Sequence, residues 1–235
     1  MNVQTRFVKS IFSQLAPTYD VLNRVLSLGK DVSWRRFAVR KLLMGRGTRF
    51  LDVAAGTCEI SLELVKVNPT VGAVAVDFTF PMLIRGKAKV AEVSQMNRVH
   101  LVLADSLQLP LPDRFFDGAI VGFGIRNMTD RRKALCEIAR VVNPGGTFVV
   151  LEFTVPNWGL LQTLYDFCLN RLIPPFGGLL SKNRVAYEHL SNSIAEFPRP
   201  EVFQEMMEGA GFTEVTYWPL TLGIVGVYVG KRAWV

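Results

Sequence analysis

Two periods of hydrophobic and polar positions alternate along the chain, and the switching between them predicts the fold. Short apolar runs, long enough for buried parallel strands, are separated by segments in which apolar residues have helical spacing. The predicted strands cover residues 48–54, 71–77, 99–104, 116–121 and 147–153, and helices are predicted near residues 58–67, 80–93 and 130–141. Repeated alternation of this kind predicts an α/β, doubly wound, mostly parallel sheet with ligands at the carboxyl ends of its strands.

The two ends of the chain complete the predicted architecture. Residues 1–45 form a predicted helical cap, with turn signals at Pro17 and Gly29. Packing on the sheet explains such a cap, but the Tyr-Asp-x-x-Asn cluster at residues 19–23 favours a second role as a lid over a ligand cleft. After a predicted helix at 200–209, strands at 212–218 and 222–230 are close enough to pair antiparallel, which brings the sheet to seven strands.

Residues 154–198 interrupt the alternation and form a predicted helical insertion. Helices are expected at 160–172 and 185–194, with a loop at Pro174–Gly178 between them. An apolar insertion beside a cleft suits an apolar substrate or a membrane surface, although ordinary packing explains a leucine-rich helix equally well. We predict that residues 1–235 form a single domain.

Composition and charge limit the compartment, the metals and the partners that are expected for this protein. No uncharged apolar stretch reaches the roughly 18 residues of a spanning helix, and the N-terminus lacks an apolar signal core, so a cytoplasmic protein is expected. The cysteines have neither metal-ligand nor disulfide spacing, and no metal is expected. The net charge of +7 fits nucleic acid, an anionic membrane face or nothing specific. Because no basic stripe with interleaved aromatic residues is visible, a nucleic-acid partner is not expected.

The segment Arg49–Ile60, RFLDVAAGTCEI, carries the first candidate site. A strand, a turn of small residues and a helix bring backbone N–H groups and a helix N-terminus to a ligand's polar end. Asp77 ends the next strand about 20 residues beyond this turn, where such folds hold a ribose by its hydroxyls. Taken alone, Asp77 or Asp105 could be a helix N-cap. The pair of signals predicts a nucleoside-bearing ligand.

Four further blocks resemble one family of enzymes. They are residues 19–23 (YDVLN), 122–127 (GFGIRN), 140–146 (RVVNPGG) and 187–194 (YEHLSNSI). Together with the glycine turn they resemble the ubiquinone/menaquinone C-methyltransferases, a branch of the class I S-adenosylmethionine-dependent methyltransferases. The resemblance covers nearly the whole chain, and residues 122–127 are its most specific part.

The resemblance implies a cofactor, S-adenosyl-L-methionine, and the residues that hold it. Gly56 and Thr57 would face its methionine end, and Asp77 would accept from its ribose hydroxyls. Asp105 and Ser106 would meet the adenine edge. Gly122, at the end of the fourth strand, would border the cofactor as well.

The resemblance also implies an acceptor, a reduced quinone whose ring carbon receives the methyl group. Such a ring needs donors for its oxygens and a group that takes a proton. Arg126 and Asn127 are predicted for the first task and His189 for the second. Where His189 stands the family commonly has an aromatic hydroxyl residue, and Tyr187, Tyr19 and a water held by Asp20 are rival bases. The structural alternative for Arg126 is a salt bridge to Asp130 at i+4.

One position departs from the family pattern. The turn usually ends Gly-Thr-Gly-Asp, whereas residues 56–59 here read GTCE. Cys58 adds a side chain where the backbone approaches the cofactor. A positive φ there would cost about 1 kcal/mol. A small buried residue is favoured over a reactive thiol at this helix N-terminus.

The leading hypothesis is C-methylation of a prenylated hydroquinone of the demethylmenaquinol type. A lipid-soluble quinol would require peripheral contact with the inner face of the membrane. The alternatives are a methyltransferase for another small apolar acceptor, and a binding subunit impaired in catalysis by Cys58. A homo-oligomer is left open.

Overall fold

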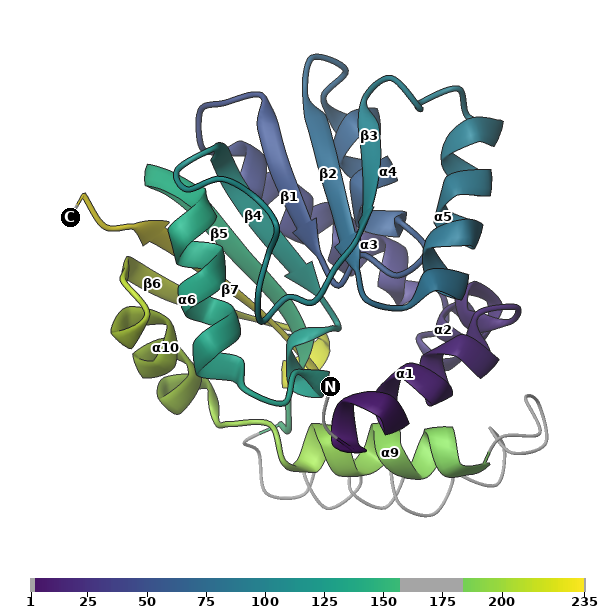
Figure 1. The fold of residues 1–235 in the computed structure, drawn as a ribbon. Coiled ribbons are helices and arrows are strands. Elements are labelled where there is room, and N and C mark those ends of the chain that lie inside the picture. Colours follow the sequence, from purple (N-terminus) through teal and green to yellow (C-terminus); the bar gives the residue numbers. More distant parts are fainter. Residues whose placement is uncertain (1–2, 157–183, 235) are drawn as a thin grey trace.

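The chain folds into one seven-stranded sheet with helices on both faces (Figure 1). The computed structural model describes residues 3–156 and 184–234. The strands are β1 Arg49–Val53, β2 Gly72–Asp77, β3 Val99–Leu103, β4 Phe116–Gly122, β5 Val142–Phe153, β6 Phe212–Leu220 and β7 Val225–Arg232. Their order is β3-β2-β1-β4-β5-β7-β6, with parallel pairing from β3 to β5 and antiparallel pairing of β7 with both β5 and β6. The predicted fold class is confirmed.

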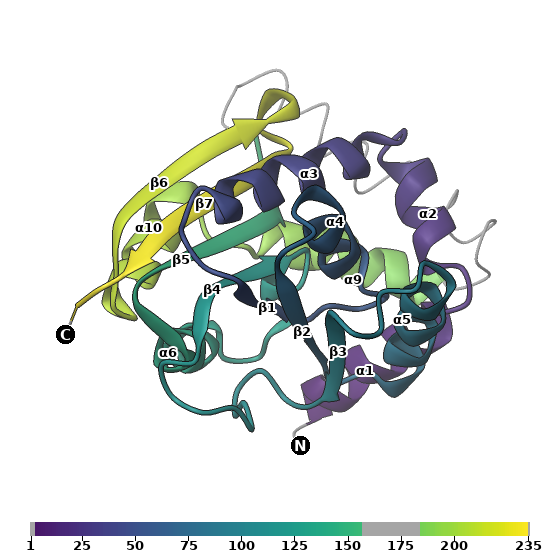
Figure 2. The same ribbon diagram turned by 90° about the horizontal axis from the view of Figure 1, so that it is seen from above.

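Two helical layers bury the sheet (Figures 1 and 2). The helices are α3 Lys30–Leu43, α4 Glu59–Val67, α5 Phe80–Glu92, α6 Arg131–Val141 and α10 Pro200–Gly209. Apolar residues of α6 and α10 form one core cluster with the sheet, and those of α3 and α4 form another on the opposite face. The third helix of the predicted cap, α3, therefore packs on the face of the sheet.

The remaining helices lie across the carboxyl ends of the parallel strands, beneath the arrowheads in Figure 1. They are α1 Val3–Leu15, α2 Tyr19–Leu26 and α9 Arg184–Ala195. Ile11 and Leu22 form a small buried cluster with Ala186 and Tyr187. Residues more than 160 positions apart thus build one layer over the edge of the sheet where a doubly wound fold binds its ligand.

The strand boundaries differ from the prediction by three residues or more at the starts of β7 and β5, since β7 begins at Val225 rather than at residue 222. The helix α6 ends at Val141, as the Asn-Pro-Gly-Gly stop requires, but β5 begins directly at Val142 rather than at residue 147. Val142 pairs with Phe116, and an irregularity between Phe116 and Gly118 absorbs the turn residues into the strand. The predicted helix at 160–172 lies outside the described residues. No helix in the described ranges is long and apolar enough to cross a membrane.

Candidate active site

The glycine turn after β1 brings its backbone to the cleft and turns its cysteine away from it. Ala54, Gly56 and Cys58 all have positive φ, at 56°, 54° and 63°. The Cys58 side chain is fully buried in a core cluster with α4, α5 and the sheet, and it packs against Gly86 of α5. Burial raises the pKa of the Cys58 thiol far above its ordinary value. The preference for a small buried residue over a reactive thiol is confirmed.

Asp77, at the end of β2, joins the first two loops of the cleft. Its Oδ2 accepts from the backbone N–H of Gly56 at 2.8 Å and its Oδ1 from that of Thr79 at 2.7 Å. The residue is only 6% exposed, and burial raises the pKa of its carboxyl while these hydrogen bonds oppose the rise. Thr79, and not Asp77, is the N-cap of α5. The plain capping interpretation of Asp77 is therefore wrong.

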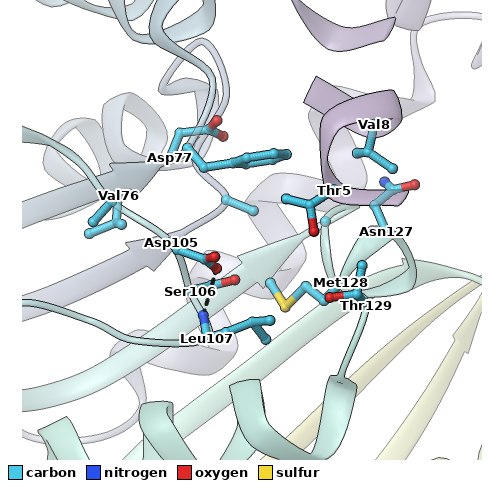
Figure 3. Close-up of a pocket in the computed structure, with 14 residues that line it drawn as sticks. Thr5, Val8, Val76, Asp77, Asp105, Ser106, Leu107, Asn127, Met128 and Thr129 are labelled. Carbon is cyan, nitrogen blue, oxygen red and sulfur yellow. Dashed lines mark hydrogen bonds between the residues drawn. The ribbon is translucent and has the colours of Figure 1, made fainter. Parts of the chain in front are cut away.

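Two small cavities meet at Asp77. The first is lined by Asp77, Asp105 and Ser106 and closed by Thr5 and Val8 of α1 (Figure 3). The second is lined by Tyr19 of α2 with Gly56, Asp77 and Gly122. Five of the six predicted cofactor residues are thereby brought together around one buried carboxylate. Asp77 lies between Asp105 and Ser106 in the first cavity and the glycine turn in the second. These polar groups fit a nucleoside with an amino-acid tail. Because α1 lines both cavities and Tyr19 of α2 lines the second, the cap takes part in the cleft.

The sixth residue, Thr57, is placed differently from the prediction. Its side chain is buried and donates to Asp20 Oδ1 at 2.6 Å, and it lines neither of these two cavities. Lys89 Nζ donates to Thr57 Oγ1 at 3.3 Å and to Asp20 Oδ2 at 3.1 Å, and it also bonds Glu59. Asp20 therefore holds the cap on the glycine turn. A water held by Asp20 stays a prediction as one of the rival bases.

Gly122 borders the second cavity, but packing explains why it is glycine. A Cβ there would lie 2.1 Å from Cδ1 of Ile60, so the end of this α4 side chain would have to move to admit a larger residue. A Cβ at Gly124 would lie 2.5 Å from Cβ of Ala54. Gly124 therefore allows the loop after β4 to lie against the loop after β1.

Arg126 lies in the turn after β4, and its partner is one that sequence reasoning missed. The turn is a 3-10 segment, Ile125–Asn127. Arg126 Nη1 donates to Glu152 Oε1 at 2.5 Å and to the carbonyl of Phe123 at 2.8 Å. The structural alternative, an i+4 salt bridge to Asp130, is wrong, because Asp130 instead caps α6 by accepting from Lys133 N–H at 2.9 Å. An acid inside the apolar run of β5 was the signal that could have identified Glu152.

Asn127 and His189 meet across the layer. His189 Nε2 lies 3.0 Å from Asn127 Oδ1, and the ring of Phe7 packs edge-on against the imidazole. Burial, followed by the positive charge of Arg126, lowers the pKa of His189, so the ring is neutral at neutral pH. When Nε2 donates to the amide oxygen, Nδ1 carries the lone pair and can accept a proton.

All three predicted catalytic residues line one larger cavity, of about 570 Å³. Its walls come from α1, the turn after β4, the start of α6 and α9. Asn127 also lines both smaller cavities, so it stands between them and the large one. The arrangement offers donors for the oxygens of a ring and a neutral base beside them. No cluster of three metal-ligating side chains occurs in the described ranges.

Comparisons with known proteins agree with this geometry. The model of the ubiE/COQ5 methyltransferase family matches residues 1–232. The ubiquinone/menaquinone biosynthesis C-methyltransferase UbiE of Geotalea daltonii is 42% identical over 226 residues, which are 96% of each chain. The demethylmenaquinone methyltransferase of Thermus thermophilus is 44% identical over 222 residues, 94% of this chain and 100% of that one.

Solved structures match the fold at low sequence identity. A [4+2]-cyclase, SpnF, has a TM-score of 0.72 at 16% identity and covers 96% of this chain and 95% of its own. A SAM-dependent methyltransferase of Thermotoga maritima, described as a possible histamine N-methyltransferase, has a TM-score of 0.65 at 20% identity and covers 95% and 98%. Because a cyclase shares the architecture, the fold by itself does not identify the reaction.

Proposed function

Because the chain belongs to the ubiE/COQ5 methyltransferase family, we propose that it methylates a ring carbon of a prenylated hydroquinone of the demethylmenaquinol type. Its relatives are named for quinone C-methylation, and they match nearly end to end. The observation that carries the proposal is the convergence of Arg126, Asn127 and His189 on one cavity, with Asn127 shared with the cofactor half.

The cofactor that we propose is S-adenosyl-L-methionine, which when bound supplies an activated methyl group on a sulfonium sulfur. Asp77 would hold the ribose hydroxyls, and Asp105 with Ser106 would meet the adenine edge. Gly56 and Tyr19 would enclose the methionine end. Cys58 does not obstruct this site, because its side chain points into the core between α4 and α5. The alternative of a subunit impaired by Cys58 thereby loses its structural basis.

The acceptor half would align the ring and make it electron-rich. Asn127 and Arg126 would hold the ring oxygens, and Arg126 keeps one donor, Nε, without a hydrogen-bond partner in the described part of the chain. His189 would take the phenolic proton, because it is neutral and has a free ring nitrogen when Nε2 bonds Asn127. These roles explain why the turn after β4 and α9, which are far apart in sequence, line one cavity.

A panel of acceptors tests the proposed reaction. Incubated with S-adenosylmethionine, the protein is expected to add one methyl group to a reduced prenylated naphthoquinol, as measured by product mass. The oxidised quinone should not react, because its ring carbons are not nucleophilic. A His189→Ala variant should be slower and keep cofactor binding. Methylation of a soluble phenol in place of the prenylated quinol would contradict the proposal and favour the other-acceptor alternative.

We also propose peripheral contact with an anionic bilayer at the layer that covers the site. Val21, Val25 and Leu28 are exposed on and just after α2, Leu28 at 89%, and Arg24 and Lys30 beside them are exposed as well. Exposed apolar side chains flanked by basic ones suit the interface of an anionic membrane. The insertion expected to make this contact falls largely within residues 157–183, outside the described ranges.

Liposome flotation measures this contact. The protein is expected to float with vesicles that contain anionic lipid and less with neutral vesicles. Replacing Val21, Val25 and Leu28 together by Ser should reduce flotation. Met44→Ser, which changes another exposed apolar residue at the far end of α3, is the control and should leave it unchanged. Equal flotation of the two variants would contradict a contact through α2.

A further inference from the structure

Glu152 is a buried acid next to the proposed acceptor site, and the proposed function assigns it no role. It lies near the carboxyl end of β5, and its side chain is 0% exposed. A buried carboxylate is costly unless it is paired and hydrogen-bonded. The groups that pair with Glu152 are therefore held firmly in place by it.

The carboxylate holds Arg126 at two points. Oε1 accepts from Arg126 Nη1 at 2.5 Å and from the backbone N–H of Phe153 at 2.8 Å, and Oε2 accepts from the backbone N–H of Arg126 at 3.3 Å. Side chain and main chain of Arg126 are thus fixed to β5 by the same residue. The second bond of Nη1, to the carbonyl of Phe123, closes the turn on itself.

This clamp reaches the acceptor cavity through the next residue. Asn127 follows Arg126 in the same 3-10 turn and bonds His189 on α9. The carbonyl of Arg126 in addition accepts from Arg131 Nη2 at 3.1 Å, at the start of α6. Since β5 is an interior strand that pairs with β4 and β7, Glu152 connects the sheet to the turn that carries both proposed acceptor-holding residues.

Stability by itself does not account for a pair in this place. Apolar residues of similar volume often replace a buried ion pair without loss of stability. Unlike apolar residues, a carboxylate paired with an arginine sets the direction of the guanidinium and neutralises its charge beside the cavity.

We propose that Glu152 is a positioning residue of the methyl transfer, which holds Arg126 and the turn that carries Asn127 in register with the acceptor. The inference rests on the proposed function of this site. It makes Glu152 act through Arg126 and Asn127, without contact to the acceptor itself. The charge of Arg126 is balanced by Glu152, so His189 meets less positive charge than an unpaired guanidinium would exert.

The central variant is Glu152→Gln, with Glu137→Gln as its matched control. Glu137 likewise accepts from an arginine, Arg140, and from a backbone N–H, that of Leu109, but Arg140 lines none of the three cavities, whereas Arg126 lines the largest of them. We expect Glu152→Gln to lower kcat about 100-fold, since a displacement of about 1 Å costs that much. The Kd for S-adenosylmethionine should change little. Glu137→Gln should keep both values near those of the parent.

A second readout does not depend on activity. The chain has two histidines, His189 in the site and His100, exposed on β3, which serves as an internal reference. The charged groups around His189 are Arg126, Asp130, Arg131, Arg132 and Glu196. NMR titration of Glu152→Gln is expected to lower the pKa of His189, because Arg126 loses its counter-charge, and to leave His100 unchanged.

The outcomes separate the two proposals. Parent-like kcat and an unmoved His189 in Glu152→Gln would overturn the positioning role. If Glu152→Gln does not fold, Glu152→Asp keeps the charge but shortens its reach, and full kcat in that folded variant would overturn the role as well. If the parent methylates no reduced quinone, the proposed function fails, and the His189 titration alone then decides on Glu152.

Discussion

An Asp77→Ala variant is expected to bind S-adenosylmethionine at least about 100-fold more weakly than the parent. Hydrogen bonds to a charged group contribute about 1.5–3 kcal/mol each, and the carboxylate would accept from two ribose hydroxyls. The variant also releases the N–H groups of Gly56 and Thr79, which Asp77 now holds. Both effects act on the same cleft, so the loss of affinity should be the largest among single changes in the cofactor half.

Calorimetric titration with S-adenosylmethionine measures this loss, and thermal unfolding separates it from misfolding. Asp113→Ala is the control, because it removes an exposed carboxylate whose partner, Arg140, lies at the end of α6. Its cofactor affinity should equal that of the parent. If Asp77→Ala is less stable and still binds the cofactor as tightly as the parent, Asp77 serves only to join two loops, and the cofactor assignment of this carboxylate is wrong.

A Gly86→Ala variant is expected to lose about 1–3 kcal/mol of unfolding free energy through overpacking. A Cβ at position 86 would lie 2.5 Å from Sγ and 3.3 Å from Cβ of Cys58, and 3.3 Å from the carbonyl carbon of Thr57. Because all of these neighbours belong to the glycine turn, the clash should also disturb cofactor binding. Sequence reasoning placed the difficulty of Cys58 at the ligand, whereas the structure places it at α5.

A double-mutant cycle in urea identifies the cause of this loss. Cys58→Gly removes the clashing side chain, so Gly86→Ala should cost much less in that background. Gly209→Ala is the control, because a Cβ there meets nothing within 4 Å at the end of α10, and it should be neutral or slightly stabilising. Equal costs of Gly86→Ala with and without Cys58 would contradict the pairing of these two positions.

Much of the fold is predictable from local patterns. Strand and helix periods, the Pro-Gly stop after α6 and the paired C-terminal strands each depend on a few neighbouring residues, so β1 to β4 and α4 to α6 fall within two residues of their predicted bounds. The start of β5 is the largest exception. Its first residues look like a turn, and they become strand because Phe116 on the neighbouring strand pairs with Val142.

The place of the candidate site in the fold was also predictable from the sequence. Residues at the carboxyl ends of parallel strands converge whatever the details of packing, which is why Asp77 and Asp105 line one cavity. Directions of side chains were not predictable. Thr57 turns to Asp20, and Arg126 turns to Glu152 instead of Asp130, because each finds a partner on an element distant in sequence.

The sequence by itself determined the architecture, the family and the edge of the sheet at which chemistry takes place, since all of these follow from periodicity and from motifs within single loops. Tertiary structure alone decided which way Cys58 points, what neutralises Arg126 and that Asn127 meets His189. The physical reason is burial. A buried polar or bulky group takes the partner or the space that the folded neighbours leave to it, and those neighbours lie 26 to 62 residues away along the chain.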